Sequence, residues 1–375
     1  MAEIARILIV GGGIAGLTLA TALHQLGLTA ELVERNPAWQ TAGAGIAVQP
    51  NGMAILRTLG LGTAVEQAGT VIAYWEYCDQ QGAVLCETDL GALWGNTASF
   101  IGIERTKLHQ ILLASAAAVP ARLGVSITSL IQDDDTVSVR YTDGSGADYD
   151  LVVGADGIGS TVRNLAFGAA PPVYAGQMSL RSVAPIRPLG LSKIQMLLGE
   201  GCYFGLCPVG DGRTYAFANV METRFYDRLQ GRLERLRQRF SGFGNIVQEY
   251  LAALESDEQI HASPIESIDQ EQWQSGRVVL VGDAAHATPP MMAQGGCMAM
   301  EDAYVLADVL RSADSVKTAL DTYIRRRTAR VRWIQEKSRA VAESFGLPLA
   351  IRNATLRERG DQLFQERFRP LVAPP

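Results

Sequence analysis

The hydrophobic positions change their spacing twice in the first part of the chain. Residues 7–10 form a continuous apolar run that ends in three glycines, and residues 14–26 carry apolar side chains at helical spacing. Gly27 follows that segment, and a second apolar run ends on Glu34. A short apolar run bounded by glycine is typical of a buried strand, and a glycine just past a helical pattern marks the end of a helix. The pattern therefore predicts strand, tight turn, helix and strand.

Further elements follow from the same signals. Asn51 is in a position to cap a helix that runs to about residue 59, and Thr106 is in a position to cap another that reaches about residue 118. Strand-like alternation occupies 71–88 and 136–153, the second around a turn-forming Asp-Gly-Ser-Gly sequence.

The character of the sequence changes between residue 173 and about residue 268. Several strand-like runs follow one another there, and helical pieces come after them. This order predicts a mostly antiparallel sheet with its own helices, inserted into the first domain. The strand-like runs are 178–186, 193–198, 202–207 and 213–221, and the helical pieces are 227–240 and 244–255.

The last part of the chain returns to the first pattern. A buried strand is expected to end at Asp283, and after a loop rich in proline and glycine a helix is expected from about Gly296 to Arg311. A long polar helix is expected over roughly 315–345, and no element is predicted in the tail, 346–375. The whole pattern predicts an α/β fold with an inserted sheet and a C-terminal helical region.

The composition excludes several classes of function. The net charge of −6 and the pI of about 5.4 argue against a nucleic-acid-binding surface. Five cysteines without a C-x-x-C pair favour reduced thiols in the cytoplasm over disulfides or a zinc site, and four scattered histidines do not suggest a metal centre. The apolar segment 7–23 is short and interrupted by three glycines, so it favours neither a signal peptide nor a membrane span.

The first turn has the spacing of a dinucleotide-binding motif. Gly11, Gly13 and Gly16 form G-x-G-x-x-G, and Glu34 follows about 20 residues later. In this motif the first glycine allows a sharp turn, the second lets backbone N–H groups approach a pyrophosphate, and the third lets helix and strand pack closely. The helix N-terminus adds partial positive charge, and Glu34 can accept hydrogen bonds from a ribose. The motif therefore predicts a dinucleotide site.

Three strand ends carry glycines, at 11–16, 154–157 and 282–283. Ligands of open α/β sheets bind beyond the carboxyl ends of the strands, so all three could contact one extended cofactor. Asp283 is placed to bond a sugar or ribityl hydroxyl, and a helix cap or turn residue is the alternative interpretation.

Three segments resemble a known family. GGGIAG at 11–16, VVGADGIGSTVR at 152–163 and VVLVGDAAHATPPMMAQGGCMAMEDA at 278–303 occur in this order. From about residue 5 to 330 the chain resembles the single-component (class A) FAD-dependent aromatic hydroxylases, flavoprotein monooxygenases that include para-hydroxybenzoate, salicylate and 6-hydroxynicotinate hydroxylases. The resemblance implies a Rossmann-type FAD-binding domain with an inserted, mostly antiparallel β-sheet substrate domain.

The resemblance also implies cofactor contacts. Asp156 is expected to touch both FAD and the nicotinamide cofactor, Asp283 the ribityl–phosphate region, and Arg105 the FAD. Glu34 and Arg35 match the adenosine-ribose site. The other expected cofactor contacts are Gly11, Gly13, Ala15 and Gly16 in the first motif, the loop from Gly43 through Gly45, Ile46 and Ala47 beside the flavin ring, and Gln294, Gly295 and Gly296 at the start of a helix directed at the flavin.

By the same resemblance, NAD(P)H reduces FAD, dioxygen adds to give a flavin hydroperoxide, and an oxygen atom is transferred to a small planar aromatic or heteroaromatic substrate. The sequence Gly-Phe-Gly at 242–244 lacks a preceding strand, so no second dinucleotide motif is present and NAD(P)H is expected to bind transiently. A flavin-dependent reductase or halogenase on the same fold and a flavin-binding sensor without turnover remain alternatives.

No catalytic acid or base is assigned from the sequence. His286 is either a base or, more in keeping with its place beside a strand end, an orienting histidine. Tyr215 and Phe217 alternate onto one strand face, which is typical of a pocket wall but also of an ordinary core. Arg181 is either a surface residue or an anchor for an anionic substrate or cofactor. The expected substrate contacts are Arg181, Tyr203, Tyr215, Phe217 and Pro290, the last in a stiff loop over the flavin.

The expected domain boundaries and partners complete the sequence-based prediction. Dioxygen and a small aromatic compound are the expected partners, with no nucleic acid, no metal and no membrane span, for a cytoplasmic monomer or homodimer. The FAD-binding domain is expected to comprise 1–72, 99–172 and 273–345, the substrate domain 73–98 and 173–272, and the tail 346–375.

Overall fold

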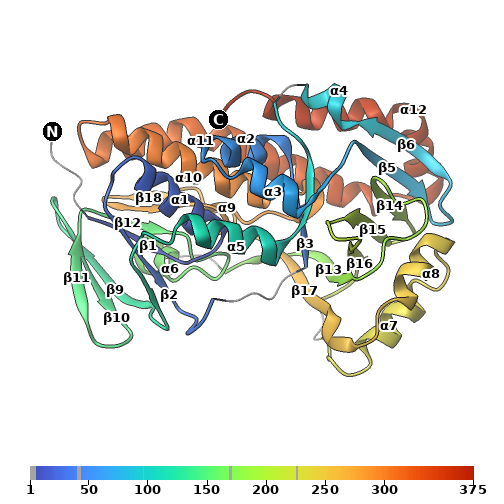
Figure 1. The fold of residues 1–375 in the computed structure, drawn as a ribbon, viewed down its shortest axis with the longest axis horizontal. Helices are drawn as coiled ribbons and strands as arrows, with labels where there is room; N and C mark the ends of the chain where they lie inside the picture. Colours follow the sequence, from blue (N-terminus) through green and yellow to red (C-terminus); the bar gives the residue numbers. More distant parts are fainter. Residues whose placement is uncertain (1–5, 40–43, 96, 169–170, 225–226) are drawn as a thin grey trace.

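A central sheet of six strands organises the computed structural model, which describes residues 6–39, 44–95, 97–168, 171–224 and 227–375. The strand order is β18-β19-β12-β1-β2-β8, and β1 pairs in parallel with both β2 and β12. Figure 1 shows β12, β1 and β2 next to one another. Of these six strands, β18 alone runs antiparallel to its neighbour. The bounds are β1 (Ile7–Val10), β2 (Ala30–Glu34), β8 (Ala121–Leu123), β12 (Leu151–Gly154), β18 (Gln274–Ser275) and β19 (Val278–Leu280).

The two faces of β1 pack against different layers. Ile7 and Ile9 lie in a buried cluster with three helices, whereas Leu8 and Val10 lie in a cluster that includes a three-stranded sheet. Side chains of a strand alternate between its faces, so a strand covered on both sides must be apolar throughout, as residues 7–10 are. The helices are α1 (Ile14–Gln25), α5 (Arg105–Ser115) and α10 (Gly295–Ser312), and the sheet contains β9 (Ile127–Gln132), β10 (Val137–Tyr141) and β11 (Gly146–Tyr149).

Other elements surround this core. The long helix α11 packs along α10, and α6 contacts β12 and β19. A small antiparallel sheet has the order β3-β7-β4, and α2 packs on α10. The bounds are β3 (Gly45–Val48), α2 (Pro50–Thr58), α3 (Gly62–Ala68), β4 (Thr70–Val71), α4 (Leu90–Trp94), β7 (Ile101–Glu104), α6 (Thr161–Phe167), α9 (Asp283–His286) and α11 (Val316–Ser344).

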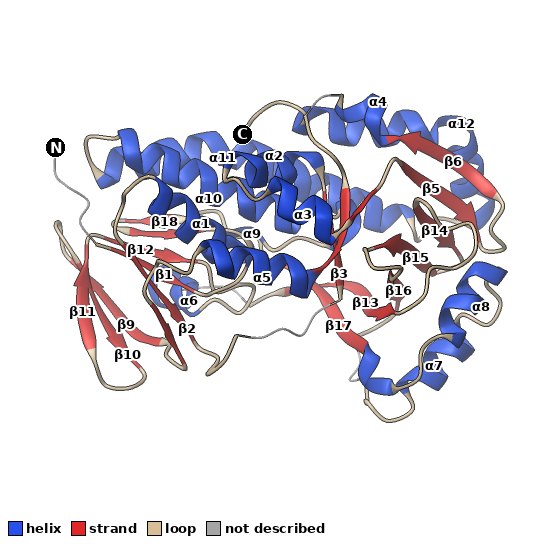
Figure 2. Ribbon diagram, viewed as in Figure 1, coloured by secondary structure: helices blue, strands red, loops and turns tan. Residues whose placement is uncertain are grey.

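Seven strands form a second large sheet, which lies at the opposite end of the molecule from β9–β11 (Figure 2). Its order is β17-β13-β16-β15-β14-β5-β6, and every pair is antiparallel except β14 with β5. The bounds are β5 (Tyr74–Asp79), β6 (Val84–Asp89), β13 (Val173–Ala184), β14 (Ile194–Leu198), β15 (Cys202–Pro208), β16 (Thr214–Met221) and β17 (Ile260–Ser267), with α7 (Arg232–Arg239) and α8 (Asn245–Ala252) beside them.

The second sheet also separates two environments. Ala216, Ala218 and Val220 of β16 pack in a buried cluster with residues of α7 and α8. Tyr215 and Phe217, on the alternate positions, pack against the cluster that includes the central sheet. The face with Tyr215 and Phe217 is therefore turned toward the rest of the protein.

The predicted α/β class with an inserted, mostly antiparallel sheet is confirmed, and three local predictions are wrong. Asn51 does not cap α2: the helix begins at Pro50 after Gln49, and Asn51 lies inside its first turn. Thr106 does not cap α5, because Glu104 precedes the helix. The tail contains the helix α12 (Leu349–Phe368), which packs along β6.

No helix in the described part of the chain combines the length and apolar character needed to cross a membrane. The five cysteines are free thiols. No group of three or more His, Cys, Asp or Glu among the described residues is arranged to hold a metal ion.

Candidate functional site

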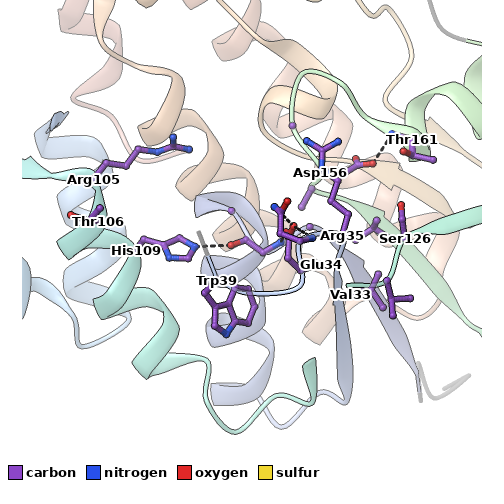
Figure 3. Close-up of a pocket in the computed structure, with 18 residues that line it drawn as sticks. Val33, Glu34, Arg35, Trp39, Arg105, Thr106, His109, Ser126, Asp156 and Thr161 are labelled. Atoms are coloured by element: carbon purple, nitrogen blue, oxygen red, sulfur yellow. Dashed lines mark hydrogen bonds between the residues drawn. The ribbon is translucent and has the colours of Figure 1, made fainter. Parts of the chain in front are cut away.

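A cleft of about 250 Å³ opens at the carboxyl ends of β1, β2 and β12. Figure 3 shows side chains of α5 on one side of it and the strand ends on the other. Six of the residues expected to bind the cofactor line it: Gly11, Gly13, Glu34, Arg35, Arg105 and Asp156. The other lining residues are Val10, Gly12, Val33, Asn36, Trp39, Thr106, His109, Val125, Ser126, Ala155, Gly157 and Thr161.

The glycine turn after β1 fulfils the geometric requirements of its motif. Gly11 has φ +108°, and a Cβ there would lie 2.5 Å from the carbonyl oxygen of Ala155. A Cβ on Gly16 would lie 1.9 Å from the carbonyl oxygen of Gly11, so α1 and the turn are in direct backbone contact. At Gly13, which precedes α1, a Cβ would meet no atom within 4 Å. The first turn of α1 is therefore open to a ligand.

Glu34 holds the glycine turn in place. One carboxylate oxygen accepts a hydrogen bond from the Gly12 N–H (2.9 Å), and the other accepts from the backbone and side-chain N–H groups of Asn36 (2.9 and 2.6 Å). These bonds position the acid at the cleft wall, where it retains acceptor capacity for ribose hydroxyls. The predicted ribose contact of Glu34 stays a prediction.

Two aromatic residues that the sequence analysis did not select cover the same turn. His109 Nε2 lies 2.9 Å from the Gly12 carbonyl oxygen, and a Cβ on Gly12 would lie 2.3 Å from the indole ring of Trp39 (Figure 3). His109 Nδ1 is buried and has no hydrogen-bond partner among the described residues. When Nε2 donates to the carbonyl, Nδ1 is a buried acceptor without a partner in the described part of the chain, on a residue that lines the cleft. The sequence could have indicated His109, because it lies four residues after the expected cofactor residue Arg105 on the same helix.

The start of α5 ties the cleft to β3. The Arg105 N–H donates to the Ala44 carbonyl (3.0 Å), and the Arg105 side chain is exposed at the cleft. Gly45 follows Ala44 and pairs with Glu104 in the small sheet. Gly43, also expected near the flavin, lies outside the described residues.

The carboxylate of Asp156 is bonded to the first turn of α6, whose N-cap is Ser160. It accepts hydrogen bonds from Ser160 Oγ and from the backbone N–H groups of Thr161 (2.7 Å) and Val162 (3.1 Å). Burial raises the pKa of Asp156, although these hydrogen bonds oppose that change. Its predicted contact with two nucleotides stays a prediction, and the contacts present make it the support of the turn after β12.

A second part of the site lies where α1, α9 and α10 begin. A Cβ on Gly282 would lie 3.2 Å from the Cβ of Ala15, and one on Gly295 would lie 3.9 Å from Oδ1 of Asp283. A Cβ on Gly296 would lie 2.9 Å from the Cδ1 of Ile46. The structure thus brings five more of the expected cofactor residues together at three helix starts, outside the set that lines the cleft: Ala15, Ile46, Asp283, Gly295 and Gly296. Asp283 is exposed there.

A buried charge cluster supports these helix starts. Asp302 accepts hydrogen bonds from the Gly282 N–H (2.9 Å) and from Arg327 Nε (2.7 Å), and His286 Nε2 lies 2.6 Å from it. Burial alone would raise the pKa of Asp302, but the charges of His286 and Arg327 lower it to about 2. Arg327 also pairs with Glu301 (2.5 Å). The side chains of Arg327, Glu301 and Asp302 are all fully buried. His286 therefore has the contacts of an orienting histidine.

Gln294 belongs to a buried amide network. Its Nε2 donates to Gln49 Oε1 (2.8 Å) and to Asn51 Oδ1 (3.1 Å), and Asn51 in turn donates to Glu301 (2.8 Å). Gln294 is 1% exposed, and its side-chain amide is surrounded by the protein groups to which it is bonded. It fixes the approach to α10, and its predicted cofactor contact stays a prediction.

The expected substrate residues meet on one face of the second sheet. The ring of Tyr215 lies against Gly45, where a Cβ would be 2.3 Å from the ring, and the ring of Phe217 lies over Gly205. Ring centroids are 5.3 Å apart for Tyr215 and Phe217, and 6.5 Å for Phe217 and Tyr203. Tyr203 also donates to Met291 Sδ (3.4 Å), next to Pro290. The aromatic face is therefore joined both to β3 and to the proline loop.

Residues 5–338 match the family described as FAD binding domain. The aurachin C monooxygenase/isomerase of Stigmatella aurantiaca is 36% identical over 321 residues, 84% of this chain and 83% of that protein. The FAD-dependent urate hydroxylase of Klebsiella pneumoniae subsp. pneumoniae is 34% identical over 348 residues, 89% of this chain and 88% of that protein. The crystal structure of Klebsiella pneumoniae HpxO complexed with FAD and uric acid matches with a TM-score of 0.91 and 30% identity, covering 99% of this chain and 97% of that one.

Proposed function

This chain belongs to the FAD-binding-domain family, and from that premise we propose that it is an FAD-dependent monooxygenase that uses NAD(P)H and dioxygen to hydroxylate a small planar aromatic or heteroaromatic compound. The observation that carries the proposal is the adjacency of three features. A nucleotide cleft, a set of open helix starts and an aromatic sheet face are joined through α1 and β3.

The residues present fit FAD. At the adenosine end, the open first turn at Gly13 suits a pyrophosphate, and Glu34 offers a carboxylate to a ribose. His109 Nδ1 is an unsatisfied buried atom beside them. At the other end, Asp283 and the N–H groups at the start of α10 would hold the ribityl and flavin portions. When bound, FAD would supply a redox-active ring that can accept electrons from NAD(P)H and react with dioxygen.

The start of α10 favours negative charge at the flavin end. Its first turn contains no acidic residue and no side-chain cap, so its N–H groups are available to a ligand. A helix N-terminus stabilises an anion by roughly 0.3–1 kcal/mol when exposed and up to about 2 kcal/mol when partly buried. The start of α10 would therefore stabilise negative charge on a bound flavin ring.

The aromatic face excludes water and orients a flat substrate. Burial raises the pKa of Tyr215 to about 12, so its phenol stays protonated and can donate a hydrogen bond at neutral pH. Tyr203 is likewise buried, and burial raises the pKa of its phenol still further. Offset or tilted aromatic contacts of this kind favour a planar ring as the bound compound.

The proposal is tested on purified protein. We expect one FAD per chain, and NAD(P)H oxidation that an aromatic or heteroaromatic substrate accelerates, with a product heavier by one oxygen atom in mass spectrometry. Bound FAD with NAD(P)H oxidation but no oxygen in any product, over a panel of urate-like purines, hydroxypyridines and aminohydroxybenzoates, would support a reductase. Bound FAD without NAD(P)H oxidation would support a sensor.

A further inference from the structure

Arg181 is a half-buried cation whose hydrogen-bonding capacity is largely unused. Its Nη2 donates to Ser263 Oγ (2.8 Å), while its buried Nε has no partner among the described residues. It forms no ion pair with any carboxylate in the described ranges. The buried Nε has lost water without gaining an acceptor, which is costly, so its presence points to a ligand that satisfies it.

Two other basic residues lie near Arg181. His261 of β17 is directly opposite Arg181 in the antiparallel pair, so the two side chains share a sheet face. Arg105 approaches from α5, because its backbone is bonded to Ala44, and Gly45 beside it carries the ring of Tyr215. Tyr215 is a diagonal neighbour of Arg181 across the β13–β16 pair.

The positive charges of these arginines affect the pKa values of neighbouring side chains. The positive charges of Arg181 and Arg105 both act to lower the pKa of Tyr215, against the raising effect of burial. Burial lowers the pKa of His261, and the charges of Arg181, Arg232 and Arg105 lower it further. Arg232 is already paired with Asp227, which leaves Arg181 and Arg105 as the cations available to a ligand.

We propose that Arg181, His261 and Arg105 form a docking corner for the diphosphate of the nicotinamide donor, at the edge of the aromatic face. The inference rests on the proposed function for the identity of the donor. A diphosphate suits the corner better than a single carboxylate does, because the three side chains come from three elements and two of them, Arg105 and His261, are exposed. The buried aromatic residues lie on the inner side, where a planar substrate belongs.

The corner also explains how a chain with one dinucleotide motif handles two nucleotides. The glycine turn and α1 form the site for the resident nucleotide, and Arg105 lines that cleft at its edge. A donor held by side chains on β13 and β17 can bind and leave without a nucleotide-binding domain of its own. Binding that depends mainly on surface cations weakens as salt is added.

The test measures binding directly, without turnover. ADP-ribose, the unreactive diphosphate part of the donor, is titrated into FAD-loaded protein by calorimetry, with Arg181→Met and His261→Gln as variants and Arg140→Met, an exposed strand arginine of β10, as the matched control. Charged hydrogen bonds of the expected kind correspond to a loss of about tenfold or more in affinity for Arg181→Met. A smaller loss is expected for His261→Gln and none for Arg140→Met. Unchanged affinity in both corner variants overturns the assignment.

Two further measurements separate the outcomes. In stopped-flow reduction by NAD(P)H, Arg181→Met should raise the donor concentration at half-maximal rate and leave the limiting rate within about twofold of the parent. If NAD(P)H does not reduce the flavin but ADP-ribose binding depends on Arg181, the proposed function fails and the docking corner stands. If Arg181→Met weakens benzoate binding and not ADP-ribose binding, the corner is a carboxylate site and the diphosphate assignment is wrong.

Discussion

Replacing Arg327 with Met should destabilise the protein far more than the loss of an ordinary surface charge. Arg327 donates to Asp302 Oδ1 (2.7 Å) and to Glu301 Oε2 (2.5 Å), and all three side chains are fully buried. Breaking a buried ion pair by removing one partner costs about 3–5 kcal/mol, because the remaining charge stays buried. Glu301 keeps Arg330 as a partner and Asp302 keeps His286, so we expect a loss near the lower end, about 3 kcal/mol.

Urea denaturation at neutral pH measures this loss in both FAD-loaded and FAD-free protein. The matched control is Arg326→Met, one residue away, whose pair with Asp308 is partly exposed and contributes about 0–1 kcal/mol. The double variant Arg327→Met with Asp302→Asn should lose less than the sum of the single variants, because the second change removes a buried charge that has already lost one of its two partners. A free energy of unfolding for Arg327→Met within about 1 kcal/mol of the parent would refute the reasoning.

Four further outcomes are expected. The pKa of Asp302 is lowered from 3.8 to about 2, so its contribution to stability is present above pH 4 and is lost as the pH falls through 2. Between pH 4 and pH 2 the free energy of unfolding of the parent should therefore fall by about 2–3 kcal/mol more than that of Asp302→Asn. Parallel curves of unfolding free energy against pH would contradict this. Glu34→Ala should weaken FAD retention by about 1–3 kcal/mol in equilibrium dialysis, whereas the exposed Glu336→Ala should not; equal retention would remove Glu34 from the site. Gly16→Ala should cost about 1–3 kcal/mol or more in urea denaturation, because its Cβ overlaps the Gly11 carbonyl, while Gly159→Ala, which meets open space, should be nearly neutral. Pro290→Ser should raise the hydrogen peroxide formed per NAD(P)H at saturating substrate, since it loosens the loop that carries Met291 against Tyr203; unchanged coupling would show that this loop does not keep the site dry.

Much of the fold could be predicted because it depends on local periodicity. The apolar run 7–10 and the glycines after it give the strand and turn directly, and the alternation at 213–221 gives β16 with its two faces. The tail was missed although Phe364 and Phe368 are four residues apart on α12. Those rings pack on Trp75 and Trp94, which are distant in sequence, so tertiary contact decides the helix more than local propensity does.

The site was predictable where backbone geometry defines it and less so where side chains form networks. Positions 11 and 16 require glycine, because a Cβ at either one would lie less than 3 Å from a backbone atom. A sequence motif shows such a requirement directly, as a glycine at a fixed spacing. Asn51 has a strong local preference for a helix cap, but its amide is used 243 residues away at Gln294. Trp39 and His109 contact the glycine turn from separate elements, and no spacing along the chain brings them together.

Alternate side chains of β16 serve two different purposes, because they lie on opposite faces of the sheet. Tyr215 and Phe217 face the site, while Ala216, Ala218 and Val220 seal the core under α7 and α8. Changes at the site-facing positions can therefore accumulate during evolution without disturbing the packing that keeps the strand in place. A combinatorial library confined to alternate positions of β13, β15 and β16 would explore new substrate preferences on an unchanged scaffold, because each randomised side chain has a neighbour in sequence that anchors the opposite face.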